Sequence, residues 1–109
     1  MPTVDETKVR LTGFADLEKG WHFGEGVSLK TEIIASANAI LEKLSSVGID
    51  RVNAFPGIAG EARVTAYLDD DYHEFTVETN GTISYVYEQH DEEIESRDGL
   101  SLSMVLKSS

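Results

Sequence analysis

The clearest pattern of apolar and polar positions lies between Ser28 and Val47. Apolar side chains recur there three and four residues apart, which places them on one face of an α-helix. Ser28 is suited to cap the first turn, and Gly48 suits the left-handed residue that follows a helix. The pattern predicts one long amphipathic helix over residues 28–47, docked by its apolar face. The apolar positions are Ile33, Ile34, Ala37, Ile40, Leu41, Leu44 and Val47.

The segment before this helix carries a weaker pattern. Residues 1–10 are polar and are expected to fray. Leu11, Phe14 and Leu17 have helical spacing, which predicts a short helix or turn that ends at Gly20.

After the long helix, the period of the pattern changes from 3.6 to 2, which is typical of β-strands. Residues 51–55 and 62–68 predict two strands, and residues 72–78 and 82–88 predict a hairpin. Asp69, Asp70 and Asp71 form the expected turn between the second strand and this hairpin. The chain therefore predicts antiparallel strands joined by short turns.

The Thr79-Asn80-Gly81 connection fixes the register of that hairpin. A two-residue loop would place the apolar side chains of the two strands on opposite faces, whereas a three-residue loop with Gly81 left-handed places them on one face. Burial favours the three-residue loop, because a slip of one residue moves every side chain across the sheet. The same-face pairs are then Val77–Ile83, Phe75–Tyr85 and His73–Tyr87.

The C-terminal part leaves alternatives open. Residues 88–99 are acidic and polar, and they predict an exposed connection or a strand extension. Residues 100–106 alternate as a further strand would, but a terminal helix from Ser101 or Ser103 fits equally well. The fold class is α+β, in one domain over residues 1–109: a long amphipathic helix packed on a mostly antiparallel sheet of four or five strands.

Charge divides the chain into unequal halves. Residues 1–60 hold 8 acidic and 6 basic residues, whereas residues 61–109 hold 12 and 3. A field of this sign repels phosphate groups and attracts basic surfaces, so we expect no direct binding to nucleic acid or membrane. The absence of cysteine excludes disulfides and thiolate chemistry. With no apolar leader segment, a cytoplasmic location is expected.

A glycine-rich segment, residues 20–26, precedes the long helix. We expect it to form a tight loop in which Trp21 and Phe23 fill the core. A loop of this kind before a helix could instead cradle a phosphate, but its spacing matches neither common phosphate-binding motif, and Glu25 would repel an anion. A small-ligand site in this loop is the alternative.

These glycines also take part in a resemblance. The order Gly20-Trp21-x-x-Gly24-x-Gly26, an amphipathic helix, Phe55-Pro56-Gly57-x-x-Gly60-Glu61 and an Asn-Gly hairpin resembles a group of small uncharacterised bacterial and mobile-element proteins. The resemblance covers about residues 11–87. It implies a small α+β domain and transfers no catalytic residue.

No motif calls for a metal, another cofactor or an enzymatic reaction. The turn at Asp69–Asp71, with His73 and Glu74, lacks the glycine and distal glutamate of a calcium-binding loop. The acidic cluster at His90 lacks the spacing of a zinc site. No serine lies in a nucleophile motif that would pair with a histidine.

The acidic half favours a binding function instead. Four tyrosines lie on the expected sheet or at its ends: Tyr67, Tyr72, Tyr85 and Tyr87. Surrounded by carboxylates, they would anchor a basic partner, or else they would pack under the helix. The hypothesis is a non-enzymatic protein that engages a basic protein surface, concretely a phage or mobile-element inhibitor of the anti-CRISPR kind that mimics nucleic-acid charge. The candidate partner-binding residues are Asp69, Asp70, Asp71, Glu74, Glu88, Asp91, Glu92, Glu93, Glu95, Tyr72 and Tyr87.

Four other interpretations stay open. An antitoxin or immunity protein would mask a toxin with the same acidic surface, and a ligand-binding or metal-binding domain would use residues 20–26. A homodimeric structural module would use an exposed sheet edge or the face that carries the tyrosines. The acidity would also be explained by solubility alone.

Overall fold

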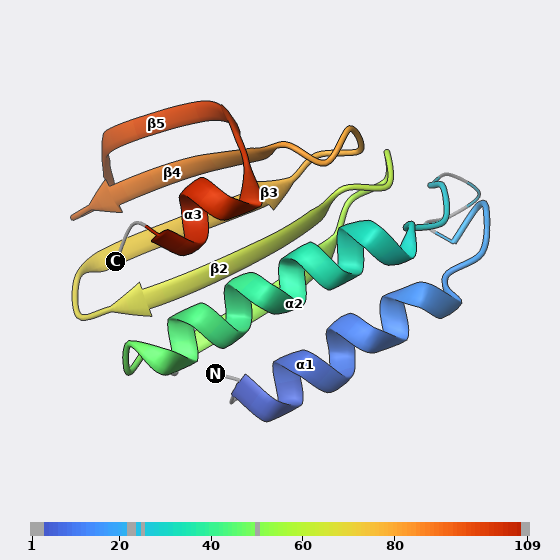
Figure 1. The fold of residues 1–109 in the computed structure, drawn as a ribbon, viewed down its shortest axis with the longest axis horizontal. Helices are drawn as coiled ribbons and strands as arrows, with labels where there is room; N and C mark the ends of the chain where they lie inside the picture. Colours follow the sequence, from blue (N-terminus) through green and yellow to red (C-terminus); the bar gives the residue numbers. More distant parts are fainter. Residues whose placement is uncertain (1–3, 22–23, 25, 50, 108–109) are drawn as a thin grey trace.

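The computed structural model describes residues 4–21, 24, 26–49 and 51–107. The described residues form three α-helices, one short 3-10 helix and five strands, which Figure 1 shows in space. In chain order they are α1 (Val4–Gly13), η1 (Phe14–Asp16), α2 (Thr31–Ser46), β1 (Arg51–Pro56), β2 (Ala62–Leu68), β3 (Asp71–Val77), β4 (Ile83–Gln89), β5 (Glu92–Leu100) and α3 (Leu102–Lys107).

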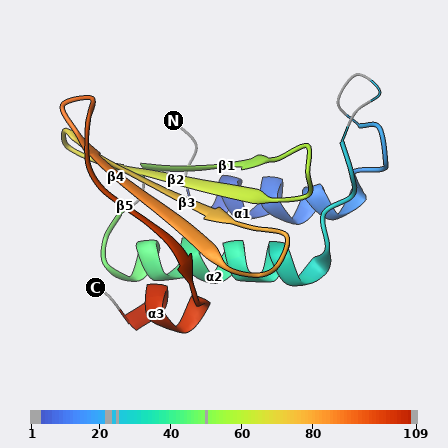
Figure 2. The same ribbon diagram turned by 90° about the horizontal axis from the view of Figure 1, so that it is seen from above.

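The strands form one antiparallel sheet in which each strand pairs with the next in the chain, in the order β1-β2-β3-β4-β5. The helices lie against one side of this sheet (Figures 1 and 2). The predicted α+β class and the predicted antiparallel sheet of four or five strands are confirmed, with five strands in the structure. The prediction of one long helix is wrong, because α1, of 10 residues, and α2, of 16, lie side by side.

Helix α1 contradicts the expectation of fraying for residues 4–10, whereas residues 1–3 lie outside the described residues. Its buried side follows Thr7, Leu11 and Phe14, and the Thr7 hydroxyl donates a hydrogen bond to the carbonyl oxygen of Val52 in β1 at 3.3 Å. Leu11 is fully buried. The sequence pattern breaks at Thr7, because a buried threonine is counted as polar although its hydrogen bond removes the cost of burial.

Helix α2 begins three residues later than predicted. Its N-cap is Lys30, which makes no side-chain capping bond, so Ser28 does not cap the helix. The preceding chain is held instead by a hydrogen bond from the Val27 N–H to the carbonyl of Ile58 and by burial of Leu29 in the core. These tertiary contacts set the entry to α2 in place of a local cap.

The predicted end of α2 is confirmed. Gly48 has φ of +87°, and its N–H donates to the Ser45 carbonyl at 3.0 Å. The Ile49 N–H donates to the Leu44 carbonyl at 2.9 Å. Together these bonds form a Schellman motif, which satisfies carbonyls that the last turn leaves without partners.

The predicted hairpin register is confirmed as well. Val77 pairs with Ile83, Phe75 with Tyr85 and His73 with Tyr87. Gly81 has φ of +88° and donates to Glu78, while the Glu78 N–H donates to the Thr82 carbonyl at 2.8 Å. Val77 and Ile83 are fully buried against the helices, so burial selected the three-residue loop.

The two open alternatives at the C-terminus are decided in different ways. The acidic segment continues the sheet as β5, which joins β4 through a turn with positive φ at His90 and Asp91. The segment after it is helix α3, whose Met104 N–H is capped by the Ser101 hydroxyl at 3.2 Å. The strand alternative for residues 100–106 is therefore wrong. Within the described chain, no helix combines the length and apolar character needed to cross a membrane.

Candidate functional site

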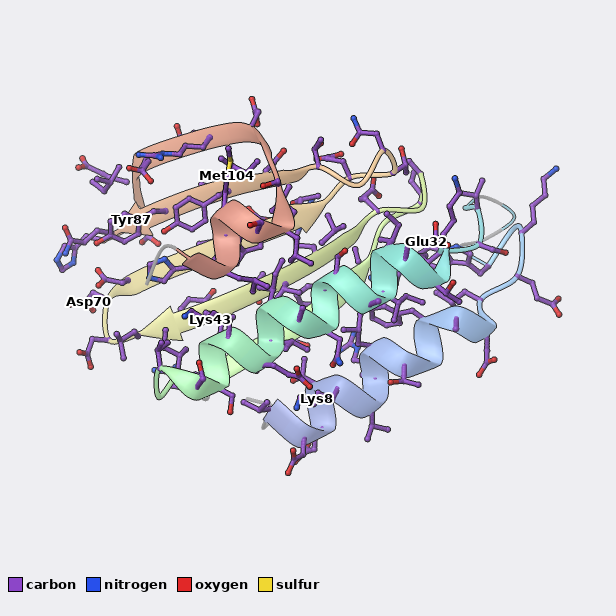
Figure 3. The ribbon with its side chains drawn as sticks, in the orientation of Figure 1. Lys8, Glu32, Lys43, Asp70, Tyr87 and Met104 are labelled. Atoms are coloured by element: carbon purple, nitrogen blue, oxygen red, sulfur yellow. The ribbon has the colours of Figure 1, made fainter. Side chains whose placement is uncertain are left out.

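Seven carboxylates gather where two hairpin turns meet. The β2–β3 turn and the β4–β5 turn lie at the same end of the sheet, and Asp70 Oδ2 is 3.9 Å from His90 Nδ1. Figure 3 places Asp70 and Tyr87 at this end. We call this group the acidic end. It comprises Asp69, Asp70, Asp71, Glu88, Asp91, Glu92 and Glu93.

Charge at the acidic end is poorly compensated. Glu88 lies directly opposite Glu93 across the β4–β5 pair, an arrangement of like charges that destabilises a sheet. Asp70 and His90 are both largely exposed, so their ion pair contributes little. Among the described residues, the other six carboxylates of the acidic end have no ion-pair partner.

Two predicted partner-binding carboxylates lie outside the acidic end and are already paired. Glu74 accepts from Arg63 Nε at 2.7 Å on the sheet face away from the helices. Glu95 lies 3.3 Å from Arg97 Nε on the helix-facing side. Their charge is compensated within the chain, so the acidic end and not the whole predicted set forms the uncompensated surface.

The four tyrosines divide between the two faces of the sheet. Tyr67 and Tyr72 contact each other on the outer face, with ring centroids 4.9 Å apart, and burial, followed by the charge of Glu74, raises the pKa of Tyr72 to about 12. Tyr85 and Tyr87 lie on the helix-facing side. The alternative in which all four tyrosines pack under the helix is therefore wrong, and the anchoring of a partner stays a prediction.

Tyr87 connects the acidic end to the helix-facing side. Its hydroxyl donates to Asp71 Oδ1 at 3.1 Å, and its ring stacks on His73 with centroids 5.0 Å apart. Burial and the hydrogen bond to Asp71 raise the pKa of Tyr87. The carboxylate thus holds the tyrosine in place at the border between the two surfaces.

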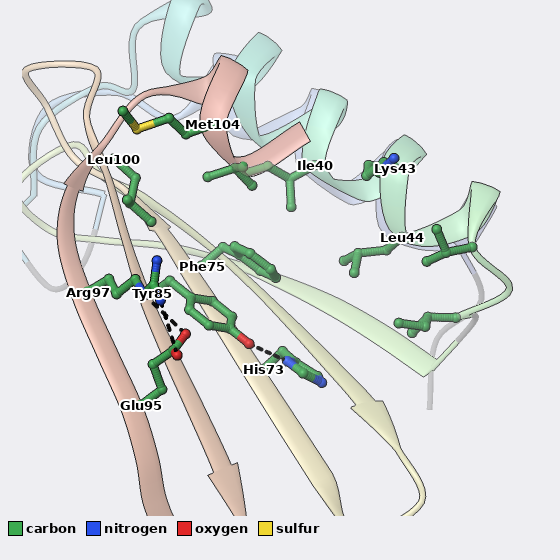
Figure 4. Close-up of a pocket in the computed structure, with 13 residues that line it drawn as sticks. Ile40, Lys43, Leu44, His73, Phe75, Tyr85, Glu95, Arg97, Leu100 and Met104 are labelled. Atoms are coloured by element: carbon green, nitrogen blue, oxygen red, sulfur yellow. Dashed lines mark hydrogen bonds and ion pairs between the residues drawn. The ribbon is translucent and has the colours of Figure 1, made fainter. Parts of the chain in front are cut away.

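Next to Tyr87, a cavity of about 520 Å³ opens between α2, α3 and the strands β3 to β5 (Figure 4). The short helix α3 covers only part of this side of the sheet, so aromatic side chains remain accessible there. We call this cavity the groove. Its lining residues are Ile40, Lys43, Leu44, Val47, Ile49, His73, Phe75, Tyr85, Glu95, Arg97, Leu100, Met104 and Val105.

A hydrogen bond of 2.7 Å between His73 Nδ1 and the Tyr85 hydroxyl crosses the floor of the groove (Figure 4). Burial lowers the pKa of His73, against the opposing effect of Asp71. Burial, followed by the charge of Glu95, raises the pKa of Tyr85 to about 12. Both side chains are therefore uncharged at neutral pH, and they form a neutral polar part of the floor of the groove, whose walls also carry Lys43, Glu95 and Arg97.

The lowered pKa of His73 predicts a pH dependence of stability. Just below pH 6.5 the unfolded chain binds a proton at this position and the folded chain does not, so the free energy of unfolding should fall as the pH falls through the lowered pKa. His73→Asn should reduce this fall, because asparagine has no group that titrates in this range. Its amide can still form a hydrogen bond with the Tyr85 hydroxyl, so the fold should be retained. Urea titrations at about pH 7.5 and about pH 5.5 measure this change in the free energy of unfolding. His90→Asn, at an exposed position, is the control, and an equal reduction in both variants would contradict the prediction.

The glycine-rich loop differs from its predicted role where the structure describes it. Trp21 is half-exposed and does not fill the core; its indole N–H donates to the Val27 carbonyl at 2.9 Å. The Gly20 N–H donates to Gly26 at 2.8 Å and the Gly24 N–H to Gly20 at 3.1 Å, so these amides are used within the loop. Phe23 and Glu25 lie outside the described residues.

The described part of the chain holds no group of three or more histidine and carboxylate side chains arranged for a metal ion. Comparison of the sequence and structure with protein-family models, curated proteins and solved structures gives no match. The resemblance to small bacterial and mobile-element proteins therefore stays a prediction.

The groove is the feature that the sequence interpretation missed. Its lining residues come from five elements that span residues 40–105, and no motif joins them. The available signal was the pairing of Phe75 with Tyr85 on the face assigned to the core. Those aromatic side chains need a covering element, and the long helix is too narrow to cover five strands.

Proposed function

We propose that this chain is a non-enzymatic binding protein whose acidic end engages a basic protein surface. The observation that carries the proposal is the convergence of two turns that are 20 residues apart in sequence, Asp70 and His90, at one end of the sheet. Like charges at this density destabilise the free protein, and a basic partner would relieve that repulsion.

Charge of this kind acts mainly on the rate and specificity of association. Exposed carboxylates steer a basic partner during diffusion and repel partners of the wrong sign, and this effect weakens as salt screens the charges. A surface that normally binds phosphate groups would be a suitable basic partner, because it displays lysine and arginine side chains with which the carboxylates of the acidic end can pair. Inhibition of a nucleic-acid-binding protein is the concrete form of the proposal.

The test compares two variants that lose the same number of negative charges. The first neutralises four exposed residues of the acidic end: Asp69→Asn, Asp70→Asn, Glu92→Gln and Glu93→Gln. It leaves Asp71 intact because that carboxylate holds Tyr87. The matched control neutralises four exposed residues elsewhere: Asp16→Asn, Glu18→Gln, Glu32→Gln and Asp98→Asn.

Proteins that the wild-type chain retains from a host extract are identified by mass spectrometry, and their affinities for the three forms are then measured. We expect the first variant to lose affinity by about tenfold or more and the control to lose far less. The affinity of the wild type should also fall steeply with salt. Equal losses in the two variants, or affinity that is independent of salt, would overturn the proposal.

A further inference from the structure

The groove beside the acidic end has the form of a site for a helix. We propose that it receives the apolar side of a short, basic amphipathic helix from the protein partner. This inference rests on the proposed function, and it adds the shape and chemistry of the segment that binds. Helices of this kind place apolar side chains at i, i+3, i+4 and i+7 in a groove, and their charged side faces outward.

The walls of the groove match two turns of a helix. One wall runs along the C-terminal half of α2, from Ile40 to the C-cap residue Val47, and is about 10 Å long at 1.5 Å per residue. Leu100 and Met104 form the facing wall, and Phe75 lies on the floor between them (Figure 4). A cavity of about 520 Å³ is large enough for a few large apolar side chains.

The rim of the groove is exposed and apolar. Met104 is 59% exposed and Val47 is 50% exposed, although both are large hydrophobic residues. An apolar rim around a cleft is typical of a protein-binding surface, and a methionine side chain adapts to different partners. The exposed rim favours a macromolecular partner over a small molecule enclosed in a cavity.

The acidic end predicts that the helix bound in the groove carries basic residues. Beyond His73 and Tyr87, the next residues on the same face are Asp71, Gln89 and Glu92, which pair across β3, β4 and β5. Two residues along a strand span about 7 Å, so carboxylates lie within one side-chain length of the groove floor. A helix seated in the groove therefore extends over negative charge, and basic residues at that end of it are complementary.

Two basic side chains line the groove, Arg97 and Lys43, and neither changes the preference for a basic helix end next to the acidic end. Arg97 is compensated by Glu95 on the same strand, with 3.3 Å between Arg97 Nε and the carboxylate. Lys43 lies on the α2 wall, so basic residues of the bound helix should avoid that wall and turn toward Asp71 and Glu92. The charges thus predict the orientation of the helix as well as its composition.

The probe is a phage-displayed library of helical peptides with randomised surface positions, selected on the full chain. We expect selected peptides to share an apolar i, i+3 or i+4, i+7 pattern with basic residues grouped toward one end. Amide and methionine-methyl NMR signals should show that they contact Met104 and Phe75. Selection of no peptide, or of peptides that contact another surface, would overturn the inference.

Two variants separate this inference from the proposed function. Val47→Gln with Met104→Gln makes the exposed rim polar, and it should weaken peptide binding at least tenfold while the fold is retained. Val9→Gln with Ile58→Gln is the matched control at positions 75% and 50% exposed, and it should leave binding unchanged.

The outcomes of the two tests differ. Peptides that lose affinity in the acidic-end variant but not in Val47→Gln with Met104→Gln would overturn the groove as a helix site and leave the proposed function supported. Apolar peptides that bind the groove and are indifferent to the acidic end would overturn the link between the two surfaces. Peptides that are indifferent to both variants would overturn the groove as a helix site and its link to the acidic end, whereas the proposed function is decided by the affinities of the host proteins for the charge variants.

Discussion

Replacement of Leu11 by alanine is expected to lower the free energy of unfolding by about 3 kcal/mol. Leu11 is fully buried and belongs to the same core cluster as Leu41 and Val52. Its truncation removes apolar contacts and leaves a cavity that the packed helices and sheet can only partly fill. This loss is a large part of the stability of a small domain.

Val9→Ala is the matched control for this prediction. Val9 lies on the same helix but is 75% exposed, so its truncation should change the free energy of unfolding by less than about 0.5 kcal/mol. Urea unfolding followed by circular dichroism measures both variants. Similar values for Leu11→Ala and Val9→Ala would show that α1 does not dock on the sheet.

Gly26→Ala is expected to lower the free energy of unfolding by about 3 kcal/mol through two separate effects. Gly26 has φ of +102°, a conformation that an alanine adopts only with strain. A Cβ atom there would also lie 2.7 Å from Trp21 Nε1. The indole would have to move, which would break its hydrogen bond to Val27.

Gly24→Ala separates these two effects. Gly24 has φ of +87°, but among the described residues no atom lies within 4 Å of the position of its Cβ. Gly24→Ala should therefore lower the free energy of unfolding only by the backbone strain, about 1 kcal/mol. Trp21 is the single tryptophan of the chain, so its fluorescence reports on the loop during urea unfolding. Equal losses in the two variants would mean that the indole does not pack on Gly26.

The parts of the fold that were predicted correctly depend on local rules. The register of β3 and β4 follows from the left-handed conformation of Gly81 and from alternation of apolar residues. The end of α2 follows from Gly48. In each case a few neighbouring residues carry enough information to determine the geometry.

The parts that were missed depend on contacts distant in sequence. Thr7 is buried because β1 supplies an acceptor for its hydroxyl, and Ser28 loses its capping role because Leu29 is drawn into the core. Strand β5 forms without an apolar pattern, since β4 offers it a row of backbone partners. None of these causes is visible in the local sequence.

The candidate site was predicted only in part. The alternating pattern placed Asp69–Asp71 in a turn but left residues 88–99 open, so it did not show that the two turns meet at one end. In a sheet of sequential antiparallel strands every second turn lies at the same end. The pattern also did not show that Glu74 and Glu95 are paired with arginines. The groove was unpredictable, since it required the C-terminal segment to be a helix and not a strand.

The strand order also has a consequence for how the chain folds. Every strand pairs with its immediate neighbour in sequence, so the sheet can grow by adding one hairpin at a time without closing a long loop. The docking of α1 is different, because Thr7 and Val52 are 45 positions apart. The sheet should therefore assemble early and the first helix should join it late, so that Leu11→Ala accelerates unfolding and leaves the rate of folding nearly unchanged.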